Sequence, residues 1–267
     1  MSDEPRGAYA AVNGLDMYYE IHGTRQPLVV LHGAYMSTGL MGEIVSSFAE
    51  MRQVIAVDLQ GHGRTADVDR PLSYEHMADD VAALLRHLEI EKADVFGYSM
   101  GGGVAIQVAI RHPEVVRKLV AASATFNSGG AHPEMFEMIE TITPELFEGS
   151  PWKEDYDRVA PNPGDFPRLV EKLKHLDLTP QDWPPESIRG IPAPTMVVIG
   201  DSDATRPEHA VEMFRLLGGG VMGDLAGLPR ARLAVLPGTS HLGMLERTDW
   251  LLPMIVEFLD APMPETG

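Results

Sequence analysis

The sequence contains no cysteine among its 267 residues. This absence excludes disulfide scaffolds, cysteine-ligated zinc sites, iron–sulfur clusters and thiol catalysis. Basic side chains are also scarce, because 21 Lys and Arg stand against 39 Asp and Glu and give a formal net charge of −18. A nucleic-acid-binding surface needs clustered Lys and Arg, and docking on an anionic membrane needs them too. We therefore expect neither nucleic acid nor a membrane as a partner.

Long apolar runs are missing as well. Every apolar stretch is interrupted by Gly, Pro or a charge before it approaches the ~18 residues of a membrane span. The first ten residues, MSDEPRGAYA, lack the basic and apolar regions of a secretory signal peptide. These features predict a cytoplasmic location. The composition, 44% apolar and 22% charged, is that of a globular protein with two domains or one large α/β domain carrying an insertion.

Short apolar runs alternate with amphipathic segments along most of the chain. Asn13-Gly14 predicts a hairpin turn, because both positions tolerate positive φ. Runs such as those at 27–31 and 54–59 are typical of strands buried on both faces of a parallel sheet, and apolar residues after Ser73 recur at helical spacing. The alternation predicts an α/β fold with a mostly parallel, doubly wound sheet of about eight strands. The predicted strands cover 9–12, 15–21, 27–31, 54–59, 93–98, 119–123, 195–199 and 233–236.

This alternation stops between Phe126 and Gly190. The segment is rich in Pro, acidic residues and large apolar residues at loosely helical spacing. We interpret residues 126–190 as a small helical cap, or lid, inserted after the sixth strand, with 1–125 and 191–267 forming the core. The alternative is a long helical connection without a lid role. The many aromatic residues favour the lid, because a polar loop would not need them.

A candidate nucleophile follows the strand predicted at 93–98. Gly97-Tyr98-Ser99-Met100-Gly101 matches the pattern G-x-S-x-G between a predicted strand and a predicted helix. A turn this sharp tolerates only small flanking residues, and it exposes the serine hydroxyl at the carboxyl end of the sheet. The hydroxyl then lies beside free N–H groups at the start of the helix.

A serine hydroxyl becomes nucleophilic only when a base takes its proton. His241 follows a predicted strand in a loop at the carboxyl edge of the sheet, and we predict that it is this base. A carboxylate must hold the imidazole in the correct tautomer. Asp201 and Asp203 both follow the strand at 195–199. Asp203 is favoured because one more turn of loop lets it reach His241, whereas Asp201 is better placed to cap the turn.

Eight other histidines are predicted to be structural or surface residues. We expect His32 to brace the loop that it begins, and His62, which has Gly on both sides, to be structural as well. Six more are predicted to be surface residues on helices or in the insertion. They are His76, His87, His112, His132, His175 and His209.

The chain order Ser99, Asp203, His241 is that of the α/β-hydrolase superfamily. Five segments resemble motifs of this superfamily, in the right order and at ordinary spacings, over nearly the whole chain. One departure is Thr65, which stands where Ser is usual, and it should be harmless. The matching segments are HGAYMS (32–37, oxyanion loop), DLQGHGRT (58–65, turn after the fourth strand), GYSMGGG (97–103, nucleophile elbow), GDSDATRP (200–207, acid loop) and GTSHLGMLER (238–247, histidine loop).

The resemblance implies a serine-nucleophile, carboxylesterase-like enzyme with a helical cap. By the family pattern, two backbone N–H groups would hold the oxyanion: that of Met100, and that of Ala34 with Tyr35 as the fallback. No metal and no organic cofactor is implied. Methionine and aromatic residues suggest an apolar substrate pocket, for which the candidates are Tyr35, Met36, Phe126, Phe136 and Trp152.

The expected reaction is hydrolysis of carboxylic esters of small or medium apolar substrates through an acyl-enzyme, and the expected partner is the small-molecule ester itself. Similar motifs also serve carbon–carbon bond hydrolases, lactonases and cofactor-free perhydrolases. A non-catalytic ligand-binding member of the superfamily is a further alternative. Nucleophilic aspartate enzymes are disfavoured, because position 99 is Ser.

Overall fold

The protein is organised around one eight-stranded sheet, which the computed structural model describes within residues 6–263. The strand order is β1-β2-β4-β3-β5-β6-β7-β8. Strand β2 runs antiparallel to both of its neighbours, whereas the strands from β4 to β8 pair in parallel. This arrangement confirms the predicted fold class. The strands are β1 (Arg6–Val12), β2 (Leu15–His22), β3 (Pro27–Leu31), β4 (Gln53–Val57), β5 (Ala93–Tyr98), β6 (Val116–Ala122), β7 (Thr195–Ser202) and β8 (Ala231–Ser240).

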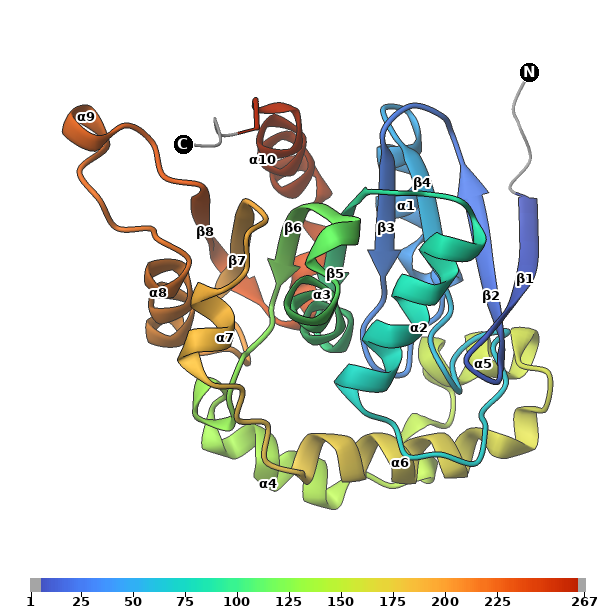
Figure 1. Cartoon of the computed structure of the whole chain (residues 1–267). Helices are drawn as coiled ribbons and strands as arrows, with labels where there is room; N and C mark the ends of the chain where they lie inside the picture. Colours follow the sequence, from blue (N-terminus) through green and yellow to red (C-terminus); the bar gives the residue numbers. More distant parts are fainter. Residues whose placement is uncertain (1–5, 264–267) are drawn as a thin grey trace.

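Helices cover both faces of the sheet (Figure 1). One face carries α2 (Tyr74–His87), α3 (Met100–Arg111) and α8 (Pro207–Leu216), and the other carries α1 (Gly42–Ala49) and α10 (Thr248–Asp260). Within residues 6–263, no helix is both long and apolar enough to cross a bilayer. The short elements of the core are η1 (Thr38–Met41), η2 (Pro113–Val115), α9 (Gly223–Ala226) and η6 (Leu242–Glu246).

Strand β3 shows why the apolar runs form central strands. Val29 and Leu31 pack into the core under α2 and α3, whereas Leu28 and Val30 pack into the core under α1 and α10. Successive side chains of a strand point to opposite faces, so a strand covered on both sides must be apolar at every position. The predicted continuous apolar run at 27–31 follows from this geometry.

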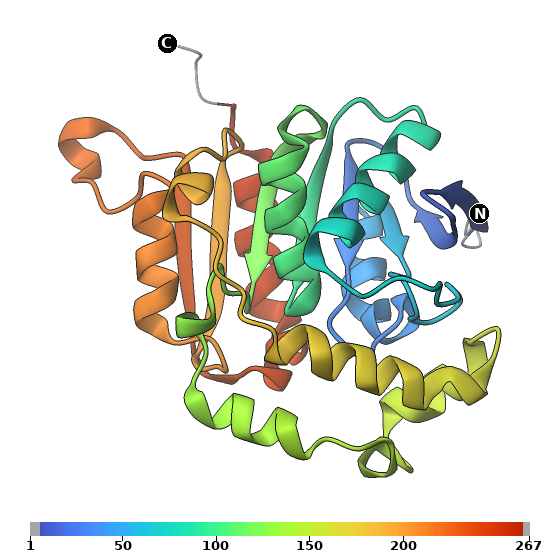
Figure 2. The same cartoon turned by 60° about the horizontal axis from the view of Figure 1, so that its bottom comes forward.

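The helical insertion (residues 126–190) joins β6 to β7 and lies across the carboxyl ends of the parallel strands (Figures 1 and 2). Lys172 fixes it to the core, because its ammonium group is 2.7 Å from Asp67 Oδ2 and donates to the carbonyls of Val68 and Arg70. Its elements are η3 (Ser128–Gly130), α4 (Pro133–Thr141), η4 (Pro144–Phe147), α5 (Pro151–Val159), η5 (Pro163–Asp165), α6 (Phe166–Leu178) and α7 (Pro185–Arg189).

Candidate active site

Ser99 lies at the sharp turn between β5 and α3. Its backbone has φ +55° and ψ −120°, a strained conformation for a residue with a side chain. The turn brings backbones so close that a Cβ atom at Gly97 would lie 2.1 Å from the carbonyl oxygen of Gly101. A Cβ atom at Gly101 would in turn lie 2.4 Å from the carbonyl oxygen of Leu31. The glycine spacing of the motif is therefore required by packing, and the strain supports a functional role for Ser99.

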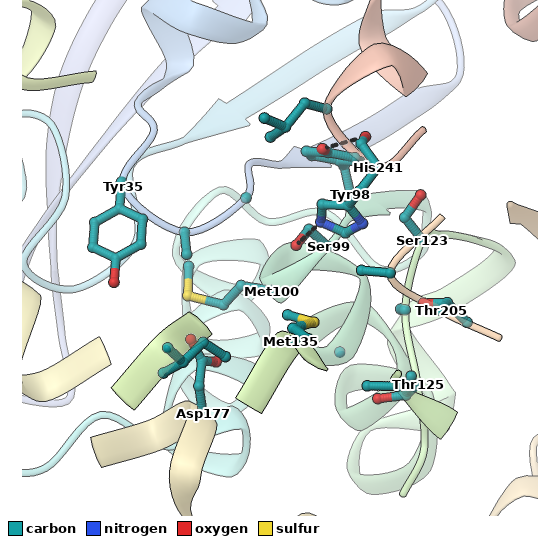
Figure 3. Close-up of a pocket in the computed structure, with 18 of the residues that line it drawn as sticks. Tyr35, Tyr98, Ser99, Met100, Ser123, Thr125, Met135, Asp177, Thr205 and His241 are labelled. Carbon is teal, nitrogen blue, oxygen red and sulfur yellow. Dashed lines mark hydrogen bonds between the residues drawn. The ribbon is translucent and has the colours of Figure 1, made fainter. Parts of the chain in front are cut away.

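A hydrogen-bonded series connects Ser99, His241 and Asp203, and Figure 3 shows the bond between Ser99 and His241. The Ser99 hydroxyl is 2.9 Å from Nε2 of His241, and Nδ1 of His241 is 2.7 Å from Oδ1 of Asp203. The carboxylate accepts a hydrogen bond from Nδ1–H, which keeps the proton on Nδ1, so Nε2 is free to accept the proton of the serine hydroxyl. The hydroxyl of Tyr98 also donates to the backbone carbonyl of His241 at 2.8 Å and fixes the start of this loop.

Asp203 is held by four donors. Besides His241, they are the Ser123 hydroxyl at 2.6 Å and the backbone N–H groups of Gly200 and Thr205, each at 3.1 Å. The side chain is only 4% exposed, and burial by itself would raise the pKa of Asp203. The hydrogen bond and charge of His241, with the other donors, instead hold this pKa below its usual value. The carboxylate is thus ionised and fixed in position.

Asp201 has a different place in the structure. Its exposed carboxylate accepts backbone N–H groups from Gly238 at 2.9 Å and Thr239 at 3.2 Å, and these bonds lower the pKa of Asp201. Asp201 therefore orders the chain just before His241 without contacting the imidazole. The structure brings Asp203, and not Asp201, to His241.

Two candidate oxyanion donors flank Ser99. Ala34 and Met100 both line the cavity above the serine. Met100 is the first residue of α3, so its N–H group has no acceptor within the helix. Tyr35 adopts φ +64°, and the N–H of Met36 closes the turn on the carbonyl of Gly33 at 3.3 Å. The loop that carries Ala34 is thus held in an uncommon backbone conformation next to the cavity.

Buried histidines brace the loops that carry these groups. His32 donates from Nδ1 to the carbonyl of Gly33 at 2.8 Å and accepts the N–H of Leu59 at Nε2. Its ring lies 5.0 Å from that of His62, which bonds the carbonyl of Gln60. Burial lowers the pKa of His32 and lowers that of His62 to about 3. Both rings are therefore neutral.

The turn that contains Thr65 is tied to the hairpin by the threonine hydroxyl. This hydroxyl donates to the carbonyl of Asp58 at 2.7 Å and accepts the N–H of Tyr18 at 2.8 Å. The Asp58 carboxylate accepts the N–H groups of Thr38 and Arg64 and so joins this turn to the loop before α1. A serine could make the same two hydroxyl bonds, which explains why Thr is accommodated.

A mostly apolar cavity of about 370 Å³ opens above Ser99 and His241 (Figure 3). Its wall includes side chains from the helical insertion, among them Met135 and Ile139 of α4 and Trp152 of α5. Three of the five predicted pocket residues lie in this wall. They are Tyr35, Met36 and Trp152.

The predictions for Phe136 and Phe126 are wrong, because neither residue lines the cavity. Met135, Met138, Ile139 and Ile142 do line it, at the i, i+3, i+4, i+7 spacing of one helix face. Phe136 lies about 100° further around α4, since each residue of a helix turns by that angle. The aromatic side chain therefore points away from this face.

Phe126 is fully buried and stacks on His209, with 4.4 Å between ring centroids. Its N–H donates to Nε2 of His209 at 3.1 Å. His209, predicted as a surface residue, is only 5% exposed. Burial and then the charge of Arg206 lower the pKa of His209 to about 4, so its ring is neutral. Helical spacing alone did not distinguish this packed ring from a solvated one.

Asp177 is a cavity residue that the sequence analysis missed. It lies in the last turn of α6 and extends into the cavity wall (Figure 3). Burial raises the pKa of Asp177 to about 7, although the nearby His241 lowers it. The available signal was an acid in the last turn of a predicted helix, where the negative end of the helix dipole disfavours it. Among residues 6–263, no cluster of three or more His, Asp or Glu side chains could hold a metal ion.

Comparisons with known proteins agree with this architecture. The model of the alpha/beta hydrolase family matches residues 28–253. A Haemophilus influenzae protein, named provisionally as an esterase or lipase, is 31% identical over 267 aligned residues, which cover 91% of this chain and 88% of that protein.

Solved structures with related folds include enzymes of different substrate classes. The 2-hydroxy-6-oxo-6-phenylhexa-2,4-dienoate hydrolase from a Rhodococcus species superposes with a TM-score of 0.76 and 24% identity, over 97% of this chain and 99% of that one. The enol-lactonase from Burkholderia xenovorans superposes with a TM-score of 0.71 and 22% identity, over 95% of this chain and 100% of that one. These two likenesses concern the fold alone. With its matching family model and its eight-stranded sheet, this chain belongs to the alpha/beta hydrolase family.

Proposed function

We propose that this protein is a serine hydrolase that cleaves carboxylic esters of small or medium, mainly apolar substrates through an acyl-enzyme. The observation that carries the proposal is the hydrogen-bonded series from Ser99 through His241 to Asp203, placed at an apolar cavity. The cavity volume, about 370 Å³, lies in the lower part of the range for small-molecule sites. The Haemophilus influenzae relative supports ester hydrolysis, because its name assigns it to the esterases or lipases.

In the first half of the reaction, Oγ of Ser99 attacks the ester carbonyl carbon while Nε2 of His241 takes the serine proton. The ionised Asp203 stabilises the resulting imidazolium through its 2.7 Å hydrogen bond. The carbonyl oxygen becomes an oxyanion, which accepts the backbone N–H groups of Ala34 and Met100. Each such donor typically contributes about 3 kcal/mol to transition-state stabilisation.

The tetrahedral intermediate then collapses, and the bond between the acyl carbon and the alcohol oxygen breaks. His241 returns its proton to that oxygen, so the alcohol leaves and the acyl group stays on Ser99. In the second half, His241 takes a proton from water as the water oxygen attacks the acyl carbon. Collapse of this second intermediate releases the carboxylic acid and returns the proton to Ser99.

The helical insertion acts in this proposal as a cap, residues 126–190, over a core formed by 1–125 and 191–267. Side chains of α4, η4 and α5 form one side of the cavity, so they exclude water and shape the space for the substrate. The cap is joined to the oxyanion loop, because the hydroxyl of Ser37 donates to the buried carboxylate of Asp155 in α5. A change in the cap can therefore alter the loop that carries Ala34.

The test combines active-site labelling with a substrate panel. A fluorophosphonate probe should label the wild type on the peptide that contains Ser99, and Ser99→Ala should show no label while it keeps its melting temperature. The wild type should then hydrolyse p-nitrophenyl esters faster than lactones or vinylogous diketones. Labelling at another residue would contradict the nucleophile assignment. Faster turnover of a lactone or a diketone would contradict the ester assignment but keep the serine mechanism.

A further inference from the structure

Asp177 places an unpaired carboxyl group in an otherwise mostly apolar cavity. In the described part of the chain, no side chain or backbone group donates a hydrogen bond to Asp177, and no basic residue pairs with it. The side chain enters the cavity on the side away from His241 (Figure 3). Among residues 6–263, the cavity wall contains no Lys or Arg that could neutralise it.

This position is unfavourable for a carboxylate in two respects. The last turn of α6 exposes backbone carbonyls, and the negative end of the helix dipole repels an anion there. Removal from water disfavours the ionised form as well, which raises the pKa of Asp177 to about 7. The Asp177 side chain is half-buried, and carboxylates withdrawn from water are usually paired, so a group that the protein itself leaves unpaired is suited to a partner supplied by a ligand.

Aromatic residues line the same cavity as Asp177. Tyr35 and Tyr74 both line it, and after burial the largest cause that raises the pKa of each phenol is the charge of Asp177. The Tyr35 hydroxyl is buried without a hydrogen-bond partner in the described structure. The ring of Phe147, a further lining residue, lies 4.5 Å from that of Tyr35. Faces of aromatic rings attract cations, and a desolvated site strengthens this attraction.

We propose that Asp177 is a specificity-determining residue that binds a positively charged ammonium group of the substrate, beside the rings of Tyr35 and Tyr74. The inference rests on the proposed ester hydrolase function and specifies its substrate class: esters with a mostly apolar body and one cationic group. The charge of the helical insertion favours the same ligand, because residues 126–190 contain 13 Asp and Glu against 6 Lys and Arg. Such an excess raises the local concentration of cations and lowers that of anions.

Two pairs of esters test the charge without changing the shape. The p-nitrophenyl esters of 4-(trimethylammonio)butanoate and 5,5-dimethylhexanoate differ only in a quaternary nitrogen against a quaternary carbon in the acyl chain. Acetylcholine and 3,3-dimethylbutyl acetate make the same exchange in the alcohol part of the ester. In at least one pair, the wild type should show a kcat/KM for the cation at least about tenfold above that for its neutral partner. Asp177→Asn should abolish this preference.

The matched control is Glu137→Gln, which removes the same charge from an exposed position on α4. In this variant the ratio of kcat/KM for the cationic ester to kcat/KM for its neutral partner should stay at the wild-type value, because Glu137 does not line the cavity. If the wild type hydrolyses both pairs of esters and prefers the cationic ester in neither pair, the inference is overturned and the proposed function is kept. An equal loss of the ratio in Glu137→Gln and Asp177→Asn would also overturn it, since the effect would then be long-range.

A binding arm keeps the inference testable if no ester is hydrolysed. In Ser99→Ala, choline should raise the melting temperature more than 3,3-dimethylbutan-1-ol does, and the difference should vanish when Asp177→Asn is added. That result without any ester turnover would contradict the proposed function and support the cation site. Equal shifts by the two alcohols, together with equal turnover of the two acyl esters, would overturn the cation site.

Discussion

The Ser123 hydroxyl donates a 2.6 Å hydrogen bond to Oδ2 of Asp203, the carboxylate whose other oxygen receives Nδ1 of His241. Ser123 follows β6 directly and has φ +53°, an uncommon conformation for a residue with a side chain. The strained backbone therefore places a donor behind the carboxylate. We interpret Ser123 as a positioning residue for Asp203.

Ser123→Ala should reduce kcat by about tenfold and leave KM nearly unchanged, because a hydrogen bond to a charged group typically contributes about 1.5–3 kcal/mol. The carboxylate would keep its three other donors, so the loss should be smaller than that for Asp203→Asn. Steady-state kinetics on a p-nitrophenyl ester measure both parameters. A rise in KM alone would contradict a positioning role.

Asp203→Asn should reduce kcat by about 10³-fold or more, since an amide favours the wrong imidazole tautomer. Asp201→Asn is the matched control, two residues away and with the same chemical change. It should reduce kcat far less, because Asp201 accepts hydrogen bonds from the backbone N–H groups of Gly238 and Thr239 and from the Ser202 hydroxyl, and none from His241. Circular dichroism would establish that both variants fold. The opposite ranking of the two variants would mean that Asp201 is the catalytic acid.

Trp152→Ala should shift the preference for ester chain length toward longer acyl groups, because it removes a large ring from the cavity wall. Phe136→Ala provides the control, since this aromatic residue belongs to the same insertion but lies outside the wall. A series of p-nitrophenyl esters from acetate to decanoate measures the profile for each variant. The cap hypothesis would fail if Trp152→Ala lost stability but kept the wild-type profile.

Acid should destabilise the fold partly through His209. Its folded pKa, lowered to about 4, is below the value of about 6.5 expected in the unfolded chain. Between these pH values the unfolded chain binds a proton that the folded protein does not bind, so the free energy of unfolding falls as pH falls. The stability from the neutral ring is complete above about pH 6.5, and its loss below pH 4 is at most about 3 kcal/mol.

His209→Gln removes the titrating group and should flatten this pH dependence, although loss of the ring stacked on Phe126 should lower stability at every pH. Urea unfolding of both proteins at pH 7.5 and pH 4.5 gives the comparison. If the two proteins lose the same free energy between these pH values, protonation of His209 is not a cause of acid unfolding.

Much of the fold is determined locally, and the sequence was sufficient for it. Continuous apolar runs predict strands covered on both faces, because alternate side chains of each strand need an apolar layer, as Leu28 and Val29 of β3 show. The glycines at positions 97 and 101 predict the serine turn, because only glycine fits where these backbones meet. The motifs around these turns also pointed to Ser99, Asp203 and His241 as the candidate catalytic residues, in the chain order of the superfamily.

The lining of the cavity was decided by tertiary structure. Helical periodicity shows that α4 has an apolar face, but the angle at which α4 docks decides that Ile139 meets the cavity and Phe136 does not. Tertiary packing also brings Phe126 and His209, which are far apart in the sequence, together as a buried pair. Asp177 follows this pattern too, because an acid near a helix end is ordinary in a sequence. Its unpaired, half-buried carboxyl group reaches the cavity only because α6 crosses the carboxyl ends of the strands, where apolar and aromatic side chains replace part of the water around it.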